Sequence, residues 1–410
     1  MSPKLGLCLA SAYLLCGVAL GFAQTPTTLY SFTGADGDGA TPSAGVILGA
    51  NGSLYGTTAF GGTFGAGTVY ELTPAVGGAW TETVLYSFTG GNDGGYPQSG
   101  VVFGLGGILY GATLNGGASG MGTVFALAPP AVSGGAWTET AIHSFSGIDG
   151  AYPYSGPIVS SSGTLYGASY LGGLGYGAVY RLMPGAGSAW TETVLYSFTG
   201  ASDGAYPYGG LAIDAKGNLY GTTAYGGAQN GVVFELARPT KSGGIWTETV
   251  LHAFEGTDGG FPFAGLVFGT NGSLYGTTAG GVGSAFGTAF ELAPPAAGKA
   301  WKQTILAKFT SGANGGTPHA ALTLAQTGAL LGTGLDGGSG SGFTGNGLVF
   351  ELNPPVTGKA WTETVLYAFH GAGDGGDPIA PLVSGANGVY YGTTMRGGTS
   401  GYGIVYSITP

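Results

Sequence analysis

One phrase, GNLYGTTAYGGAQNGVVFELARP over residues 217–239, recurs in near copies along almost the whole chain. Its aromatic-glycine core returns seven times, at intervals of 54 to 60 residues. A unit of this size is too small to bury a core alone, so neighbouring units must pack together as one large repeat domain rather than two or three ordinary ones. The cores lie at Tyr55, Tyr110, Tyr166, Tyr220, Tyr275, Leu331 and Tyr391.

The composition is that of an ordered chain despite its glycine content. Without a period, 89 glycines and 21 prolines in 410 residues would indicate disorder. Aromatic residues make up 12% and hydrophobic residues 43%, which is enough apolar surface to offset chain entropy. Charged residues are only 7% and the net charge is −10, so the chain lacks the basic surface that nucleic-acid binding requires.

Each repeat contains four β-type segments separated by turn residues. In the first repeat they span residues 45–48, 53–58, 67–73 and 80–88, and they are rich in β-branched and aromatic residues. Asn51-Gly52 joins the first pair, a dipeptide that accepts the positive φ values of a tight hairpin. No helical periodicity is present.

Seven such units predict an all-β fold, a seven-bladed β-propeller of four-stranded antiparallel blades within residues 24–410. Small residues such as Ser43-Ala44-Gly45 precede the innermost strands, as crowding near a central axis would require. The expected blades span approximately residues 44–88, 99–145, 155–198, 209–254, 264–309, 320–369 and 379–410.

The two ends of the chain carry complementary parts of a repeat. Residues 28–33 match the outermost strand of the other repeats, whereas the last repeat ends without such a strand. We therefore expect Leu29 to Phe32 to pair with Gly403 to Ile408 and close the ring. The alternative, an open β-solenoid, would not need matched half-repeats at its ends.

The first 23 residues have the layout of a secretory signal peptide. Lys4 precedes an apolar run over residues 5–22, and Gly21-Phe22-Ala23 offers a cleavage site after a small residue. Cys8 and Cys16 both lie inside this segment, so the mature chain would have no disulfide. No later apolar run is long enough to span a bilayer. We expect a monomer secreted to the periplasm or the extracellular space.

The repeated phrase resembles a known tandem repeat. Leu54-Tyr55-Gly56-Thr57-Thr58, followed by Gly61-Gly62 and Gly67-Thr68-Val69-Tyr70, is similar to the repeat of the bacterial choice-of-anchor GloVer proteins (Gloeo/Verruco repeat), over nearly the whole mature chain. The resemblance implies an exported repeat protein, often with a C-terminal sorting anchor. The GNLYGTT phrase is also similar to NHL-type propeller repeats, which implies a fold and no particular activity.

An Asp-Gly-x-x-Pro linker precedes each blade, with asparagine replacing aspartate once, at Asn314. If the aspartates gather at one mouth of the channel, several carboxylates would suit a structural cation such as calcium, the only cofactor we consider. The simpler interpretation is that each side chain closes its own turn. The aspartates are Asp38, Asp93, Asp149, Asp203, Asp258 and Asp374.

Aromatic residues flank the linker proline in successive repeats, which predicts an aromatic sector on one face. Flat rings beside hydrogen-bonding groups suit sugars, and a clustered exposed patch marks a binding site. The alternative is that the rings wedge adjacent blades together. The candidate ligand-binding residues are Tyr96, Tyr152, Tyr154, Tyr206, Tyr208, Phe261 and Phe263, joined by Tyr170, Tyr176 and Tyr225 from the glycine-rich loops.

Catalytic candidates are few. Of the histidines, His143 and His252 replace a strand tyrosine, and no catalytic or metal-binding motif is present. Asp336 and Asp377 stand outside the repeat pattern in neighbouring blades and form a candidate acid pair for glycoside cleavage. The sequence thus favours a non-catalytic module that binds an extracellular polysaccharide or a cell-surface protein. A polysaccharide hydrolase or lyase and a purely structural envelope protein remain as alternatives.

Overall fold

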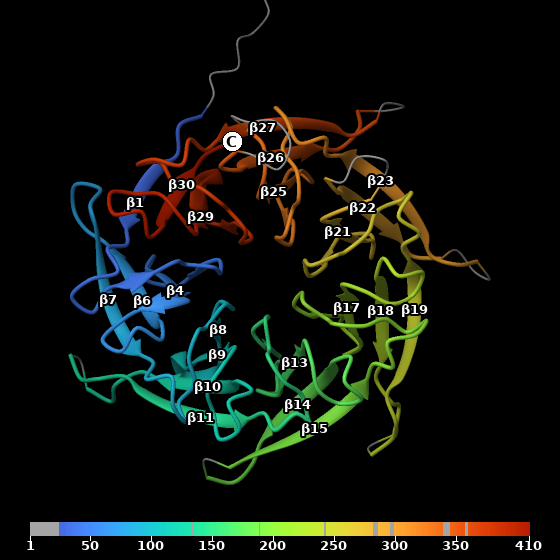
Figure 1. Cartoon of the computed structure of the whole chain (residues 1–410), viewed down its shortest axis with the longest axis horizontal. Helices are drawn as coiled ribbons and strands as arrows, with labels where there is room; N and C mark the ends of the chain where they lie inside the picture. Colours follow the sequence, from blue (N-terminus) through green and yellow to red (C-terminus); the bar gives the residue numbers. More distant parts are fainter. Residues whose placement is uncertain are drawn as a thin grey trace, which may run out of the picture.

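The computed structural model describes residues 24–132, 134–187, 189–241, 243–281, 286–295, 299–338, 345–356 and 360–410. The expected signal peptide, with both cysteines, lies outside these residues. Seven four-stranded sheets stand in a ring around a central opening (Figure 1). The predicted all-β, seven-bladed propeller is therefore confirmed. Among the described residues only two 3-10 turns are helical, at Leu105–Gly107 and Ala386–Gly388, and no helix is long and apolar enough to cross a membrane.

In blades 1 to 6 the strands run outward from the channel in chain order. In blade 1 the antiparallel order is β3 (Ile47–Leu48), β4 (Leu54–Thr58), β6 (Thr68–Pro74) and β7 (Trp80–Ser87). Blades 2 to 4 repeat it with β8 (Val102–Phe103), β9 (Leu109–Thr113), β10 (Thr123–Ala128) and β11 (Thr138–Ser144); β12 (Ile158–Val159), β13 (Leu165–Ser169), β14 (Ala178–Pro184) and β15 (Trp190–Ser197); and β16 (Ala212–Ile213), β17 (Leu219–Thr223), β18 (Val232–Ala237) and β19 (Thr247–Ala253).

Blades 5 and 6 have the same order, and their innermost strands are equally short. In blade 1 the strand expected over residues 45–48 is shortened to Ile47–Leu48, and Gly45 lies close to the neighbouring blade 7. A Cβ built on Gly45 would lie 2.7 Å from the carbonyl oxygen of Pro381, which confirms the predicted crowding. The strands are β20 (Val267–Phe268), β21 (Leu274–Thr278), β22 (Thr288–Ala293) and β23 (Lys302–Lys308), then β24 (Thr323–Leu324), β25 (Leu330–Gly334), β26 (Leu348–Asn353) and β27 (Thr362–Ala368).

The chain ends meet in blade 7. The N-terminal β1 (Thr27–Ser31) pairs antiparallel with β30 (Ile404–Ile408), which continues through β29 (Tyr390–Thr394) to β28 (Val383–Ser384). Phe32 N extends the pairing by donating to Gly403 O at 3.0 Å. The predicted closure is therefore confirmed, and the open solenoid is excluded.

A β-bulge shows that β1 is a true outer strand. In every blade one residue of the outer strand is skipped in the register, which bends the strand and increases its twist. The strand from the other end of the chain has its bulge at the equivalent position. The skipped residues are Leu29, Leu85, Ile142, Leu195, Leu251, Leu306 and Leu366.

Buried aromatic pairs join each blade to the next, and we call them the blade joints. The phenylalanine that follows or ends each outer strand packs against an aromatic ring in the third strand of the next blade, with centroids 5.0 to 5.3 Å apart. All these rings are almost fully buried. The pairs are Phe32–Tyr70, Phe88–Phe125, Phe145–Tyr180, Phe198–Phe234, Phe254–Phe290, Phe309–Phe350 and Phe369–Tyr406.

Candidate binding site at the channel mouth

The Asp-Gly-x-x-Pro linkers carry backbone strain in every repeat. The residue before each proline is not glycine, yet its φ lies between 51° and 59°, a left-handed value that bulky side chains rarely adopt. Hydrogen bonds on both sides hold it there: Tyr206 N donates to Tyr176 O at 2.8 Å, and Ala224 N donates to Tyr206 O at 3.1 Å. The seven residues are Thr41, Tyr96, Tyr152, Tyr206, Phe261, Thr317 and Asp377.

Each linker is also bridged to the glycine-rich loop of its own blade. In blade 1 the bridge forms a short ladder between β2 (Gly39–Ala40) and β5 (Phe60–Gly61). In other blades it is a single antiparallel bridge, such as Ala205 with Tyr225 in blade 4. The residues of the linkers and the loops therefore lie side by side on a rigid backbone.

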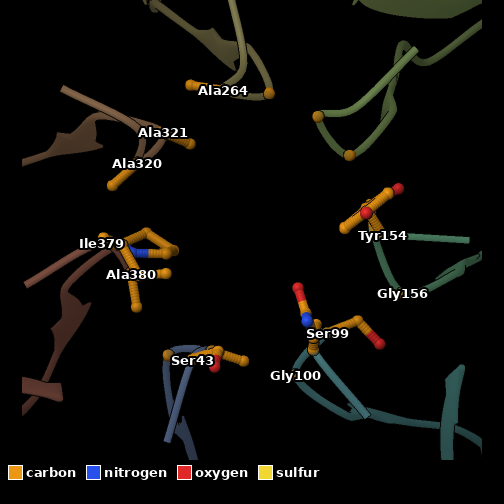
Figure 2. Close-up of a pocket in the computed structure, with 18 of the residues that line it drawn as sticks. Ser43, Ser99, Gly100, Tyr154, Gly156, Ala264, Ala320, Ala321, Ile379 and Ala380 are labelled. Carbon is orange, nitrogen blue, oxygen red and sulfur yellow. The ribbon is translucent and has the colours of Figure 1, made fainter. Parts of the chain in front are cut away.

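The residue after each linker proline lines the mouth of the central channel. These seven residues belong to the wall of one cavity of about 480 Å³. Many of its other lining residues are glycines and alanines. Figure 2 shows Ser43, Gly100, Gly156, Ala264 and Ala380 around the opening, with Tyr154 beside it. The mouth is polar at blades 1 and 2, aromatic at blades 3 to 5, and mixed beyond. In chain order the residues are Ser43, Gln98, Tyr154, Tyr208, Phe263, His319 and Ile379.

Eight rings on the aromatic side form one contact network, which we call the aromatic platform. Tyr154 stacks on Tyr208 with centroids 4.4 Å apart, and Tyr170 stacks on Tyr206 at 5.1 Å. Edge and tilted contacts with centroids 5.2 to 6.2 Å apart connect these stacks to each other and to the other rings. All eight rings are partly exposed. The platform consists of Tyr154, Tyr170, Tyr176, Tyr206, Tyr208, Tyr225, Phe261 and Phe263.

Two tyrosines of the platform, Tyr170 and Tyr208, have raised pKa values. Burial, with the neighbouring Tyr154 and Tyr170 adding to it, raises the pKa of Tyr208 to about 12. Burial also raises the pKa of Tyr170. These two side chains therefore offer phenol hydroxyls that can donate as well as accept hydrogen bonds.

Two of the predicted ligand-binding residues lie apart from the platform. Tyr96 contacts Phe60 of the neighbouring blade, at 5.3 Å between centroids, and among the described residues Tyr152 makes no ring contact. A further residue at the mouth, His319, is not among the predicted ligand-binding residues, yet its ring centroid lies 5.0 Å from that of Phe263. His319 follows Pro318 just as Tyr154 follows Pro153, so the linker alignment contained this signal.

Four titratable residues lie at blades 6 and 7, and one of them, His319, contacts the platform through Phe263. Burial lowers the pKa of His319, opposed by the charge of Asp336. Asp377 forms an ion pair with Arg396. Burial raises the pKa of Asp377, Arg396 counteracts this, and the charge of Asp336 raises it further. Asp336 thus influences both His319 and Asp377, while the Asp377 carboxylate already has a cationic partner.

The repeated aspartates do not ring the channel mouth. None of the six lines its cavity, because each carboxylate turns back to its own linker. Asp203, for example, accepts hydrogen bonds from Thr199 N at 2.8 Å and from the Tyr196 hydroxyl at 3.0 Å. Burial alone would raise the pKa of Asp203, but the bonds from Thr199 and Tyr196 lower it.

The same turn-closing geometry recurs at the other aspartates. The strand tyrosine that bonds Asp203 is replaced by histidine in blade 4, where His252 Nε2 lies 2.8 Å from Asp258 Oδ2. The contacts of these aspartates therefore fit the simpler interpretation, in which each side chain closes its own turn. Among the described residues no three Asp, Glu, His or Cys side chains form a group that could hold a metal ion.

Solved structures share the fold at low sequence identity. The extracellular domain of the one component system BT4673 from B. thetaiotaomicron matches with a TM-score of 0.55 and 11% identity over 94% of this chain, which spans 41% of that chain. The polysaccharide lyase Uly1 matches with a TM-score of 0.51 and 12% identity, over 93% of this chain and 92% of that chain. An ulvan lyase of polysaccharide lyase family PL25, bound to -[GlcA(1-4)Rha3S]-, matches with 0.50 and 9% over 94% of both chains.

No curated protein matches the sequence. A family model does match it, in three overlapping segments that cover residues 20–174, 132–344 and 247–410. These segments include every blade of the propeller. The chain belongs to the Gloeobacter/Verrucomicrobia repeat family.

Proposed function

We propose that this protein is an exported module that binds an extracellular glycan at the channel mouth. The aromatic platform carries the proposal. Its partly exposed rings gather at blades 3 to 5, on linkers whose backbone is fixed by hydrogen bonds. Aromatic faces pack against sugar rings, and the tyrosine hydroxyls can form hydrogen bonds with sugar hydroxyls.

Polar residues of the mouth also favour a bound sugar chain. Ser43 and Gln98 line the same cavity at blades 1 and 2, so a glycan that extends beyond the rings would meet polar groups there. A cavity of about 480 Å³ is in the range of small-molecule sites. Because the site is preformed, little affinity is lost to ordering the loops.

The test is binding of neutral and acidic oligosaccharides, measured by glycan array and then by calorimetry. We expect Tyr206→Ala and Tyr208→Ala each to weaken the best ligand about tenfold or more, while thermal unfolding changes little. Phe60→Ala is the matched control, because Phe60 occupies the same loop position in blade 1 as Tyr225 in blade 4 and lies outside the platform.

Two results would contradict this function. One is that no glycan binds, which would favour a structural envelope protein. The other is that the platform variants change only the unfolding temperature, which would make the rings wedges between blades.

A second candidate function, glycan cleavage, is favoured by the titratable group beside the platform. A partly buried histidine with a lowered pKa is neutral near pH 7 and able to accept a proton, and His319 touches the platform through Phe263. Two polysaccharide lyases share the propeller fold. Turnover on a panel of polysaccharides that disappears in His319→Ala and in Asp336→Ala would support cleavage. Binding without turnover would leave a binding module.

A further inference from the structure

A second cavity lies between blades 3 and 4, at the end of the blades away from the channel-mouth linkers. Its wall includes the β16–β17 turn and the segment between β18 and β19. In an antiparallel blade these two connections share one edge, whereas the β17–β18 loop and the linkers share the other. The cavity is about 790 Å³ and is separate from the channel.

Basic residues are concentrated around this cavity, which we call the basic pocket. The chain has only ten lysines and arginines and a net charge of −10, yet four of the ten line this one pocket. Among the described residues no carboxylate lies within 4.0 Å of their side-chain nitrogens. The four are Arg181, Lys216, Arg238 and Lys241.

Arg181 departs from the repeat at a position that is usually acidic. It faces Tyr166 across the β13–β14 ladder, in the place where Glu71 faces Tyr55 in blade 1. One guanidinium nitrogen, Nη2, donates to Thr193 Oγ1 at 3.3 Å. The Nε atom is buried and has no partner among the described residues, so a donor in the pocket remains unsatisfied.

Arg238 also departs from the repeat, because Pro74 holds the equivalent place in blade 1. Its backbone N donates to Asn218 Oδ1 at 3.0 Å. Its side chain lies over the β16–β17 turn, since a Cβ on Gly217 would be 3.0 Å from Nη1 of Arg238. The Arg238 side chain therefore lies over the same turn that contains Lys216.

The nearest acid on the turn is already engaged. Asp214 Oδ1 accepts hydrogen bonds from Lys216 N and Asn218 N, each at 2.8 Å, and its Oδ2 accepts one from Asn218 Nδ2 at 3.1 Å. It shapes the turn rather than neutralising the basic side chains. Like charges gathered without counter-charges are unfavourable by themselves and attract an anion.

We propose that the basic pocket binds an oxyanion, a sulfate, phosphate or carboxylate group, carried by a larger organic ligand. Guanidinium groups bind such oxyanions with paired hydrogen bonds, and lysine adds charge. The volume of about 790 Å³ accommodates much more than a single ion. Tyr166 and Trp246, which meet edge to face at 6.0 Å, provide an apolar wall for the rest of the ligand.

The experiment measures binding of inorganic sulfate, inorganic phosphate, a sulfated oligosaccharide, a uronate oligosaccharide and a neutral oligosaccharide at two salt concentrations. We expect the anionic oligosaccharides to bind more tightly than the bare ions and to weaken as salt rises. In Arg181→Glu, and in the double variant Lys216→Glu with Arg238→Glu, we expect affinity to fall about tenfold or more.

The Arg181→Glu variant has a safeguard against misfolding, because glutamate is the residue that blades 1, 4, 5 and 6 carry at this position. Lys302→Glu, an exposed outer-strand residue of blade 5, matches the change in charge away from the pocket and should leave binding intact. Tyr206→Ala should also leave it intact, which separates this site from the channel mouth.

Tight binding of the bare ions alone would overturn the proposal of a larger ligand. Equal binding by the wild type, Arg181→Glu and the double variant would overturn the site itself.

Discussion

Aromatic side chains are buried at the blade joints but partly exposed at the channel mouth. At the joints a phenylalanine occupies the same place seven times, always buried against a phenylalanine or tyrosine of the next blade. At the mouth seven equivalent positions hold seven residues of six types, from Ser43 to Ile379, and the rings among them are partly exposed. Uniform positions follow from what every blade needs, so positions that vary around the ring are where a specific ligand is recognised.

The largest loss of stability is expected for Phe254→Ala. This ring is fully buried and packs on Phe290 with centroids 5.2 Å apart. Replacing it with alanine leaves a cavity in a tightly packed joint, and we expect a loss of about 3–5 kcal/mol in the free energy of unfolding. Denaturant unfolding followed by tryptophan fluorescence measures it.

Phe263→Ala is the matched change at the mouth. Its ring is only half-buried, so we expect a loss of about 1 kcal/mol or less, together with weakened glycan binding. If Phe263→Ala destabilises the protein as much as Phe254→Ala, the platform is a structural wedge and the contrast between the two regions fails.

A smaller effect concerns the carboxyl group of Glu248, an outer-strand residue near the linker residue Asp203. Burial, assisted by the charge of Asp203, raises the pKa of Glu248 from 4.5 to about 7. The equivalent residue of blade 5 is Gln303, whose Nε2 donates to Asp258 O at 3.1 Å. Glu248 Oε1 is buried without a partner among the described residues, so a protonated Glu248 would imitate this glutamine.

We therefore expect Glu248→Gln to act in a pH-dependent way. Because the pKa is higher in the folded protein than in the unfolded chain, the contribution of Glu248 to stability is present below pH 4.5 and is lost as the pH rises towards 7. The glutamine variant should unfold at nearly the wild-type temperature at pH 4.5 and at a higher temperature at pH 8. Calorimetry of both proteins across this range measures the difference. A constant difference would show that Glu248 does not titrate in this range.

Much of the fold was predictable because it is repeated. The period, the half-repeats at both ends and the small residues near the axis each follow from a need that every blade shares, and all three agree with the structure. The shortness of the inner strands was less predictable. The sequence predicts a strand that starts at Gly45, but the observed strand starts at Ile47. Gly45 lies close to the backbone of residue 381, which is far away in the sequence.

The candidate sites were harder to predict because they depend on contacts between repeats. The linker pattern indicated the aromatic sector, yet it grouped Tyr96 with residues of the platform, from which it lies apart. The four basic residues are scattered between positions 181 and 241 and gather only when blades 3 and 4 pack together. A residue that differs from the repeat can be recognised in the sequence. Whether several such residues lie close together in space cannot.

The last predicted effect, a gain in stability, tests whether the strained linkers serve the mouth. Thr317 is a β-branched residue with φ of 51°, and its buried Oγ1 has no partner among the described residues. Thr317→Gly relieves both penalties while adding chain entropy to the unfolded state, so we expect a net gain of about 1 kcal/mol in stability. Tyr206→Gly relieves the same backbone strain but removes a platform ring, so it should weaken glycan binding. Thermal unfolding together with glycan titration separates the two outcomes. A loss of stability in Thr317→Gly would mean that the threonine side chain itself holds the linker in place.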